Sequence, residues 1–419
     1  MKILIAAAAC HPTSGSEAYV GWQAVSQLRR DHDLWVLTSG WCREGIEVFL
    51  EKNPDWRNVQ FFYVDKALPD HPNRLVARIF SWIRYRRWCL LAAKVGEKLA
   101  AEVKFDLAQH VTMATWRTGS PLSGIGIPWI WGPIGGGENF PSTMLPVLSP
   151  VAILFEIVRG LNTMMAKRSP AVRCAAGSAA LVLPNNPETE SLVVSLGVPK
   201  ERIRRLCQSF LPEERLERLK RKASITPREC GELRCLAGGN LEGRKGVAIA
   251  LHALVQLKRE GISFRYTYLG RGPELAHLKA MADRLGIAER VNFVDSLSGD
   301  EYVQALQSSH VYLLPSLREG VPVTQMEAMA AGCVPVVADC GGAGPMASSA
   351  GSKPVKVTTP AAMAQHIGDT LRSIWENPEE WSHLSLKAGQ GIFEGYSAGN
   401  YRSMINRYYR VVVSTSGRQ

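Results

Sequence analysis

The 419-residue sequence contains no apolar run of the roughly 18 residues needed to cross a bilayer. The nearest candidate, 145–158, is interrupted by Pro146, Pro150 and Glu156. Metal-ligand spacings are also missing, because no Cys-x-x-Cys pair and no Cys/His cluster occurs among the nine cysteines. We therefore expect no membrane-spanning helix and no metal site. An odd number of cysteines without such motifs predicts a reduced, cytoplasmic chain.

Two common phosphate-binding motifs are absent as well. Neither Gly-x-Gly-x-x-Gly nor Gly-x-x-x-x-Gly-Lys occurs, and no Asp-x-Asp stands in a metal-binding context. The composition, with 46% hydrophobic and 21% charged residues, is that of a soluble globular protein. The 49 Lys and Arg against 38 Asp and Glu give a net charge of +11, which suits an anionic partner. Charge alone leaves a sugar nucleotide, a phospholipid and a nucleic acid open.

Strand and helix patterns alternate twice along the chain. The first series runs from the apolar segment after Met1 to about residue 208, and the second restarts at Leu233. This pattern predicts an α/β protein with two parallel sheets, whose ligands bind beyond the carboxyl ends of the strands. We expect domains at 1–208 and 209–395, with a final helix within 396–419.

The segment 311–332 combines a strand, a loop and a helix. Val311–Leu314 reads as a buried strand and Val323–Ala331 as a helix, whose N-terminus would favour an anion such as a phosphate. Glu319 lies in the loop, and Glu327 lies on the helix eight positions later. Carboxylates accept hydrogen bonds from sugar hydroxyls, so the pair suggests a ligand with both phosphates and a sugar. Taken alone, each glutamate would be better explained as a solvated charge, Glu319 in a loop and Glu327 on a helix surface.

This segment resembles the E-x7-E element of the family 4 retaining glycosyltransferases. Pro315-Ser316, Glu319-Gly320 and 327–332 follow the family pattern, whereas Val321-Pro322 replaces the usual Phe-Gly. The resemblance implies the GT-B fold, in which two Rossmann-like domains face each other across a cleft and a C-terminal helix crosses back to the first domain. It also implies that Glu319 is catalytic, by binding the donor sugar, and that the donor further contacts Gly320, Val321, Pro322, Val323, Thr324 and Glu327.

The loop 238–246 opens the second domain with glycines and two cations. Gly239, Asn240, Arg244 and Lys245 could bind a diphosphate, since Lys supplies a point charge and Arg binds oxygens in pairs. A solvated turn is the alternative. In the family an arginine usually stands where this chain has Asn240, so Arg244 could supply the missing charge.

The first domain offers further candidates. Gly15, in the loop before the first helix, would admit a donor close to the backbone. His110 ends a predicted strand, and the family has a catalytic His there, although a lone His is more often structural. The sequence around Gly136, Gly137 and Glu138 also resembles the family. We expect these residues to lie in a flexible loop and to face the acceptor.

The residues and the resemblance together predict a retaining hexosyltransferase. It would use a nucleotide-diphosphate sugar, without metal or cofactor, to glycosylate a hydroxyl of a glycan or lipid-linked acceptor. A nucleotide-sugar epimerase, a hydrolase and a non-catalytic binding protein remain alternatives. The segment 73–101 has an apolar stripe bordered by arginines, which predicts either peripheral docking on the inner face of an anionic membrane or an ordinary core helix.

Overall fold

The structure, a computed structural model, describes residues 1–15, 17–65, 74–220 and 225–416. The chain divides into two compact units. The first comprises Met1–Gly137, Leu161–Gln208 and Tyr401–Gln419, and the second comprises Glu138–Gly160 and Ser209–Asn400. The second unit therefore includes residues 138–160 and 396–400, which lie outside the range 209–395 expected from the sequence.

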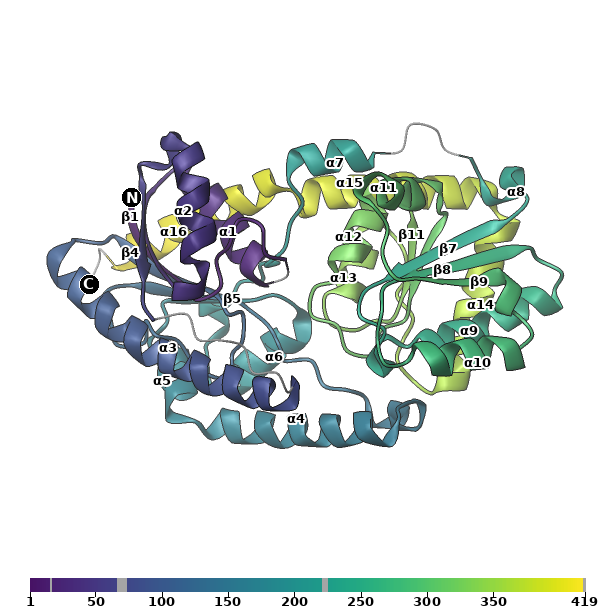
Figure 1. Cartoon of the computed structure of the whole chain (residues 1–419), viewed down its shortest axis with the longest axis horizontal. Helices are drawn as coiled ribbons and strands as arrows, with labels where there is room; N and C mark the ends of the chain where they lie inside the picture. Colours follow the sequence, from purple (N-terminus) through teal and green to yellow (C-terminus); the bar gives the residue numbers. More distant parts are fainter. Residues whose placement is uncertain (16, 66–73, 221–224, 417–419) are drawn as a thin grey trace. The chain divides into compact units, whose positions relative to one another are not determined.

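The first unit is built on a six-stranded parallel sheet with the order β3-β2-β1-β4-β5-β6. Five of its helices follow or connect the strands (Figure 1). In chain order the elements are β1 (Lys2–Ala7), α1 (Glu17–Leu28), β2 (Asp33–Thr38), α2 (Arg43–Lys52), β3 (Val59–Tyr63), α3 (Arg74–Glu102), β4 (Leu107–Thr112), β5 (Trp129–Ile134), α5 (Pro170–Ser178), β6 (Leu181–Pro184) and α6 (Pro187–Ser195).

The second unit contains a five-stranded parallel sheet with the order β11-β10-β7-β8-β9. Helices α9 and α10 cover one face of this sheet, and α11 and α12 cover the other (Figure 1). The elements are α7 (Glu213–Leu219), α8 (Pro227–Cys230), β7 (Leu233–Gly238), α9 (Val247–Arg259), β8 (Phe264–Leu269), α10 (Leu275–Arg284), β9 (Val291–Val294), α11 (Gly299–Ser308), β10 (Val311–Leu314), α12 (Val323–Ala330), β11 (Val334–Val337), α13 (Ala343–Ser349), α14 (Pro360–Glu376) and α15 (Pro378–Gly395).

The apolar runs that predicted strands become the interior of both sheets. Every residue of β4, β5, β6, β10 and β11 is buried, as expected for parallel strands covered by helices on both faces. The strand order reverses between β1 and β4 in the first sheet and between β7 and β10 in the second. In doubly wound sheets ligands bind at such reversals, so the loops after β7 and β10 are the place to look for a site.

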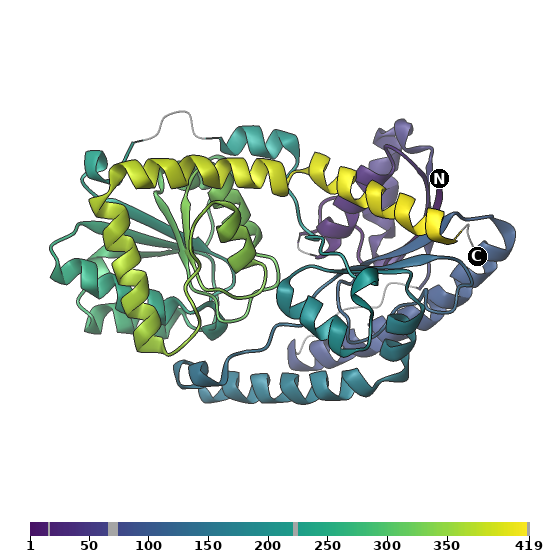
Figure 2. The ribbon, with the colours of Figure 1, turned by 180° about the vertical axis from the view of Figure 1, so that it is seen from behind.

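Two long helices complete the chain. Helix α4 (Pro150–Arg168) begins in the second unit and ends in the first. Helix α16 (Ala398–Ser416) returns to the first unit, where it ends near the C-terminus (Figure 2). There the Tyr409 hydroxyl donates a hydrogen bond to the buried Gln109 amide oxygen, and Asn406 Oδ1 lies 2.6 Å from His32 Nε2. Within the described ranges, no helix is both long and apolar enough to cross a bilayer.

Candidate functional site

The loops after β7 and β10 meet at the strand reversal of the second sheet. Gly246 has φ of +66°, a left-handed conformation that favours glycine, and a Cβ there would lie only 2.1 Å from the Pro315 carbonyl oxygen. The Leu317 amide donates to the Arg244 carbonyl oxygen at 2.8 Å. The two loops are thus joined backbone to backbone, which fixes the cations of one beside the carboxylate of the other.

Lys245 and Glu319 form a buried ion pair at this junction. The Lys245 ammonium donates to Glu319 Oε2, and the residues are 7% and 8% exposed. Arg244 Nη1 lies 4.0 Å from the same carboxylate oxygen and donates to the Arg318 carbonyl oxygen at 3.0 Å. Arg244 Nε donates to Glu242 at 2.6 Å. The structure therefore brings together three residues that the sequence predicted separately, and it pairs Glu319 with both predicted cations.

Gly239 and Asn240 lie next to this pair. A Cβ on Gly239 would stand 3.5 Å from Lys245 Nζ, so the ammonium lies over this glycine. Asn240 is exposed, and its backbone carbonyl oxygen accepts a hydrogen bond from the Tyr268 hydroxyl at 3.4 Å. Burial raises the pKa of that hydroxyl, and the nearby Glu319 charge raises it further, so Tyr268 remains a donor.

The N-terminus of α12 borders the same place. Pro322 occupies the cap position, and no side-chain hydrogen bond caps this end of the helix. Thr324 packs against Gly238, because a Cβ on that glycine would meet Thr324 Cγ2 at 2.9 Å. Val323 is 42% exposed. The helix start, its positive dipole end and Lys245 therefore adjoin one another, which suits an anionic group.

Glu327 is held by two residues that the sequence did not single out. Arg215 of α7 donates to Glu327 Oε1 from Nε at 2.9 Å and from Nη2 at 2.7 Å. The Tyr302 hydroxyl of α11 donates to Glu327 Oε2 at 2.7 Å. Burial raises the Tyr302 pKa, with Glu327 adding to the effect, so this group stays protonated. Arg215 belongs to a charged stretch near the predicted domain boundary, and neither residue is part of a motif, so only the fold identifies them.

A third loop touches the backbone of Glu319. Gly341 has φ of +56° and passes so close to the Glu319 carbonyl that a Cβ would lie 1.6 Å from its oxygen. The Gly342 amide donates to the Gly320 carbonyl oxygen at 2.9 Å. Glu138 reaches the same loop, since its Cγ would lie 3.5 Å from the Gly341 Cβ. This predicted acceptor-side residue is 4% exposed and therefore belongs to the surroundings of Glu319 in the second unit.

The other predicted acceptor-side residues belong to the first unit. A Cβ on Gly136 would meet Arg117 Nη1 at 2.7 Å, and one on Gly137 would meet Thr189 Cα at 2.5 Å. Strand β5 continues to Ile134 and so ends just before these glycines, where the sequence suggested a flexible loop. The description of this region as flexible needs correction, because both glycines are packed tightly against neighbouring atoms.

Gly15 and His110 lie at the strand reversal of the first sheet. Gly15 precedes α1, is exposed, and would have no atom within 4 Å of an added Cβ. His110 is only 1% exposed, and its Nε2 lies 3.1 Å from the Tyr85 hydroxyl oxygen. Burial lowers the His110 pKa from 6.5 to about 4, so its imidazole is neutral at neutral pH. Within the described residues Nδ1 has no hydrogen-bond partner.

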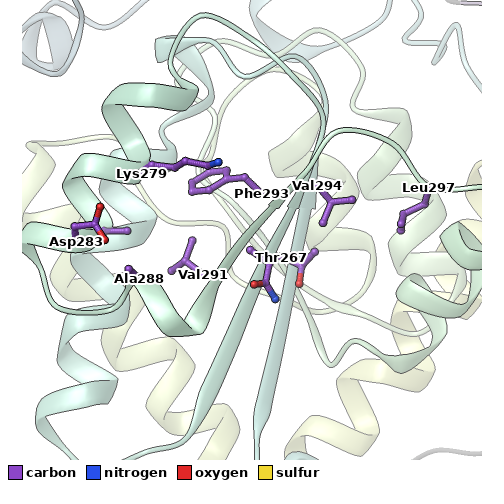
Figure 3. A pocket seen from close by; sticks show the side chains of 10 residues that line it. Thr267, Lys279, Asp283, Ala288, Val291, Phe293, Val294 and Leu297 are labelled. Atoms are coloured by element: carbon purple, nitrogen blue, oxygen red, sulfur yellow. The ribbon is translucent and has the colours of Figure 1, made fainter.

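The second unit also has a separate cavity of about 590 Å³ beside the edge strand β9 (Figure 3). Lys279, Asp283 and Phe293 line this cavity, and neither Lys245 nor Glu319 is among its lining residues. Val294, at the end of β9, and Leu297, in the turn that follows, also line this cavity. In the part of the chain that the structure describes, no group of three His, Cys, Asp or Glu residues could hold a metal ion.

Comparison with solved structures defines the architecture. The chain is similar to Anabaena HepE in complex with UDP, with a TM-score of 0.64 and 16% identity over 98% of this chain and 100% of the other. The two parallel α/β units and the returning C-terminal helix are those of the GT-B class, as predicted.

The sequence comparisons concern part of the second unit. Residues 227–388, which carry the Lys245 and Glu319 loops, match the model of the family described as glycosyl transferases group 1. Two relatives are the putative colanic acid biosynthesis glycosyltransferase WcaL of Escherichia coli, 31% identical over 163 residues, and the amylovoran biosynthesis glycosyltransferase AmsK of Erwinia amylovora, 33% identical over 163 residues. Each match spans 38% of this chain and 38% of the relative, so well under half of either protein is covered.

Proposed function

We propose that the protein is a retaining glycosyltransferase that moves a hexosyl unit from a nucleotide-diphosphate sugar to a hydroxyl of a glycan or lipid-linked acceptor. The buried Lys245–Glu319 pair beside the start of α12 carries this proposal, because it offers cations for phosphates and a carboxylate for sugar hydroxyls at one place. The match of residues 227–388 to the glycosyl transferases group 1 model supports the proposal. Support for the donor comes from structural relatives crystallised with UDP and with UDP-glucose.

In the proposed complex the diphosphate binds between the Lys245 loop and the start of α12. Lys245 and Arg244 contribute charge, and the backbone of 320–324 with Gly239 and Asn240 contributes close polar contacts. A diphosphate would draw Lys245 toward itself and leave Glu319 available to the donor sugar. Glu327 would accept hydrogen bonds from the ribose, since Arg215 and Tyr302 occupy three of its roughly four acceptor positions.

The proposed chemistry breaks the bond between the anomeric carbon and the diphosphate oxygen. The acceptor hydroxyl attacks that carbon from the same face, and the departing diphosphate oxygen takes its proton. Lys245, Arg244 and the α12 dipole stabilise the charge that develops on the diphosphate, which requires neither a metal nor a cofactor. We propose that His110 and Gly15 of the first unit contact the donor, and that Gly136, Gly137 and Glu138 contribute to the acceptor side.

A donor screen tests this function. Purified protein is first tested by thermal shift with UDP-, GDP- and ADP-sugars, and mass spectrometry then follows the best donor with candidate acceptors. Transfer of a hexosyl unit with the anomeric configuration kept is expected, and the double variant Lys245→Met, Glu319→Leu, which removes both members of the ion pair, serves as the control without the cation. Free sugar plus nucleoside diphosphate would indicate a hydrolase, an altered nucleotide sugar an epimerase, and binding without turnover a non-catalytic protein.

A further inference from the structure

Helix α4 presents an apolar face to solvent. It is one uninterrupted helix of 19 residues (Figures 1 and 2), about 28 Å long at 1.5 Å per residue. Eight of its large apolar side chains are between 45% and 73% exposed, and at 100° per residue they occupy about half of the helix circumference. These residues are Val151, Leu154, Phe155, Ile157, Val158, Leu161, Met164 and Met165.

The opposite face of α4 carries polar groups, and these point toward the protein. Glu156 accepts from Arg318 Nη2 at 2.7 Å, Arg159 donates to the Glu138 carbonyl oxygen at 2.7 Å, and Thr163 Oγ1 accepts from Arg117 at 3.0 Å. A surface helix of a globular protein normally buries its apolar side and exposes its polar side. Helix α4 has the reverse arrangement, so its outer face requires an apolar partner.

The charges along α4 identify the chemistry of that partner. Its one acidic residue, Glu156, is engaged by Arg318 with 13% of its side chain exposed, whereas Lys167 and Arg168 at the C-terminal end are exposed. Apolar side chains with flanking cations and no exposed carboxylate are typical of helices that lie in a membrane interface. The net charge of +11 also favours an anionic surface. We propose that α4 docks this protein on an anionic lipid bilayer, with its eight apolar side chains inserted below the headgroups.

A second copy of the chain fits this face less well. Stable protein interfaces take about 20 to 30 residues from each partner, and the exposed apolar face of α4 has eight large side chains. In many arrangements of two copies, the Lys167 and Arg168 side chains of one copy would lie near those of the other. Such like-charge contacts are unfavourable, because this face has no exposed acidic residue to offset them. A lipid surface meets neither difficulty.

Docking through α4 would place the lipid close to the residues around Glu319. Arg318, which holds Glu156 of α4, immediately precedes Glu319, and its carbonyl oxygen accepts from Arg244. Arg159 of α4 holds Glu138, which lies beside the Gly341 loop. The docking itself is independent of the proposed glycosyl transfer, because it depends only on the outer face of the helix.

Vesicle flotation of the full chain tests the inference. Vesicles of pure phosphatidylglycerol and of pure phosphatidylcholine are compared, with the triple variant Val158→Glu, Leu161→Glu, Met165→Glu as the probe. Wild-type protein should float with phosphatidylglycerol, and the triple variant should partition at least about tenfold more weakly, since three charges enter the inserted face. A matched control is Leu386→Glu, Phe393→Glu on α15, which changes residues 69% and 53% exposed elsewhere. This control should float like the wild type.

Three results would overturn the proposal. Wild-type protein could fail to float with phosphatidylglycerol at low salt, or the triple variant could float as well as the wild type. Light scattering could instead reveal a wild-type dimer that the triple variant converts to a monomer, which would assign the face to self-association. Circular dichroism with thermal melting confirms that each variant is folded, so a loss of flotation reports on the helix surface. Donor binding, measured separately, does not enter these outcomes.

Discussion

Arg215 binds Glu327 through two nitrogens that share a single carboxylate oxygen, at 2.9 and 2.7 Å, while the Tyr302 hydroxyl binds the other oxygen at 2.7 Å. Helices α7 and α11 thereby fix the orientation of a glutamate on α12. The side chains of Arg215 and Glu327 are 22% and 15% exposed, so the pair is partly desolvated. One lone pair of Glu327 Oε2 therefore remains available to accept a hydrogen bond from a ligand hydroxyl.

Glu327→Ala should weaken binding of the nucleoside diphosphate. Loss of hydrogen bonds to a charged acceptor costs about 1.5 to 3 kcal/mol, or roughly 10- to 150-fold in affinity. Isothermal titration calorimetry measures this change, and Glu327→Gln, which keeps an acceptor oxygen, should lose less. An unchanged affinity in Glu327→Ala would remove Glu327 from the donor site.

Arg215→Ala should weaken nucleotide binding through Glu327. We expect a loss of about 1 kcal/mol, the net value of a typical hydrogen bond, because the carboxylate keeps Tyr302 but loses its second anchor. In the Glu327→Ala background the same change should have no further effect on affinity. A double-mutant cycle measures this coupling, and equal effects of Arg215→Ala in both backgrounds would show that Arg215 acts independently.

Lys245 and Glu319 should depend on each other for stability. Glu319→Leu leaves the buried Lys245 ammonium without its carboxylate, so it should lower the free energy of unfolding by about 3 to 5 kcal/mol. Lys245→Met should cost less, because Arg244 Nη1 still lies 4.0 Å from Glu319 Oε2. The double variant removes both charges and should recover most of that loss, as measured by urea denaturation. Recovery of stability without recovery of turnover would separate the structural role of the pair from its chemical role.

Glu319→Ala should affect turnover more than affinity for the nucleoside diphosphate. Removing the carboxylate frees Lys245 for phosphate, so binding of the diphosphate should stay constant or tighten, while transfer falls. Steady-state kinetics and calorimetry on the same preparation measure the two effects. Loss of diphosphate binding comparable to that of Lys245→Met would contradict the assignment of Glu319 to the sugar.

His110 should make stability depend on pH. The folded protein holds a neutral imidazole down to a pKa of about 4, whereas the unfolded chain protonates near 6.5. Stability is therefore complete above pH 6.5 and is lost as the pH falls toward 4, by about 3 kcal/mol in total. His110→Gln should flatten this part of the profile in thermal melts recorded between pH 7 and pH 4, relative to wild type.

The proposed contact of His110 with the donor sugar has its own test. His110→Ala should reduce turnover by about a hundredfold if the side chain positions the sugar. Nucleotide affinity should change little. If the variant instead unfolds near the assay temperature, the histidine is structural, which its burial next to Tyr85 also allows.

The sequence predicted the two α/β units because their strands are short apolar runs. Val311–Leu314 was expected as a strand and is β10 with the same bounds. Glu319 and Lys245 were also identified beforehand, since both stand in motifs. Their contact could not be predicted, because 74 residues separate them and the strand order that brings their loops together is a tertiary property. Arg215 was missed for the same reason, at a separation of 112 residues.

The sequence and the structure suggest membrane contact through different helices, α3 and α4. The sequence suggested 73–101, of which Asn73 and the side chains of Leu75, Ile79 and Trp82 lie outside the described residues. Ile83 and Leu90 of α3 are exposed, and this prediction stands as a second test in the flotation assay, through Arg84→Glu, Arg86→Glu and Arg87→Glu. The apolar segment 145–158 was noticed only as too short to span a bilayer. The apolar face of α4 points to solvent because Glu156 and Arg159 hold the opposite face against the protein. These contacts cannot be predicted from the hydropathy of the sequence.

The hydrogen bond from Tyr409 to Gln109 has a consequence for synthesis on the ribosome. The two residues are 300 positions apart, and the whole second unit is translated between them. At about 5 to 20 residues per second, roughly 15 to 60 seconds pass between the emergence of the two partners. During that interval the buried surface that α16 covers, around His32 and Gln109, lacks its cover. The second unit is translated in full before Tyr409 of α16 emerges, so the first unit, which holds the start of the sequence, is the last to be completed.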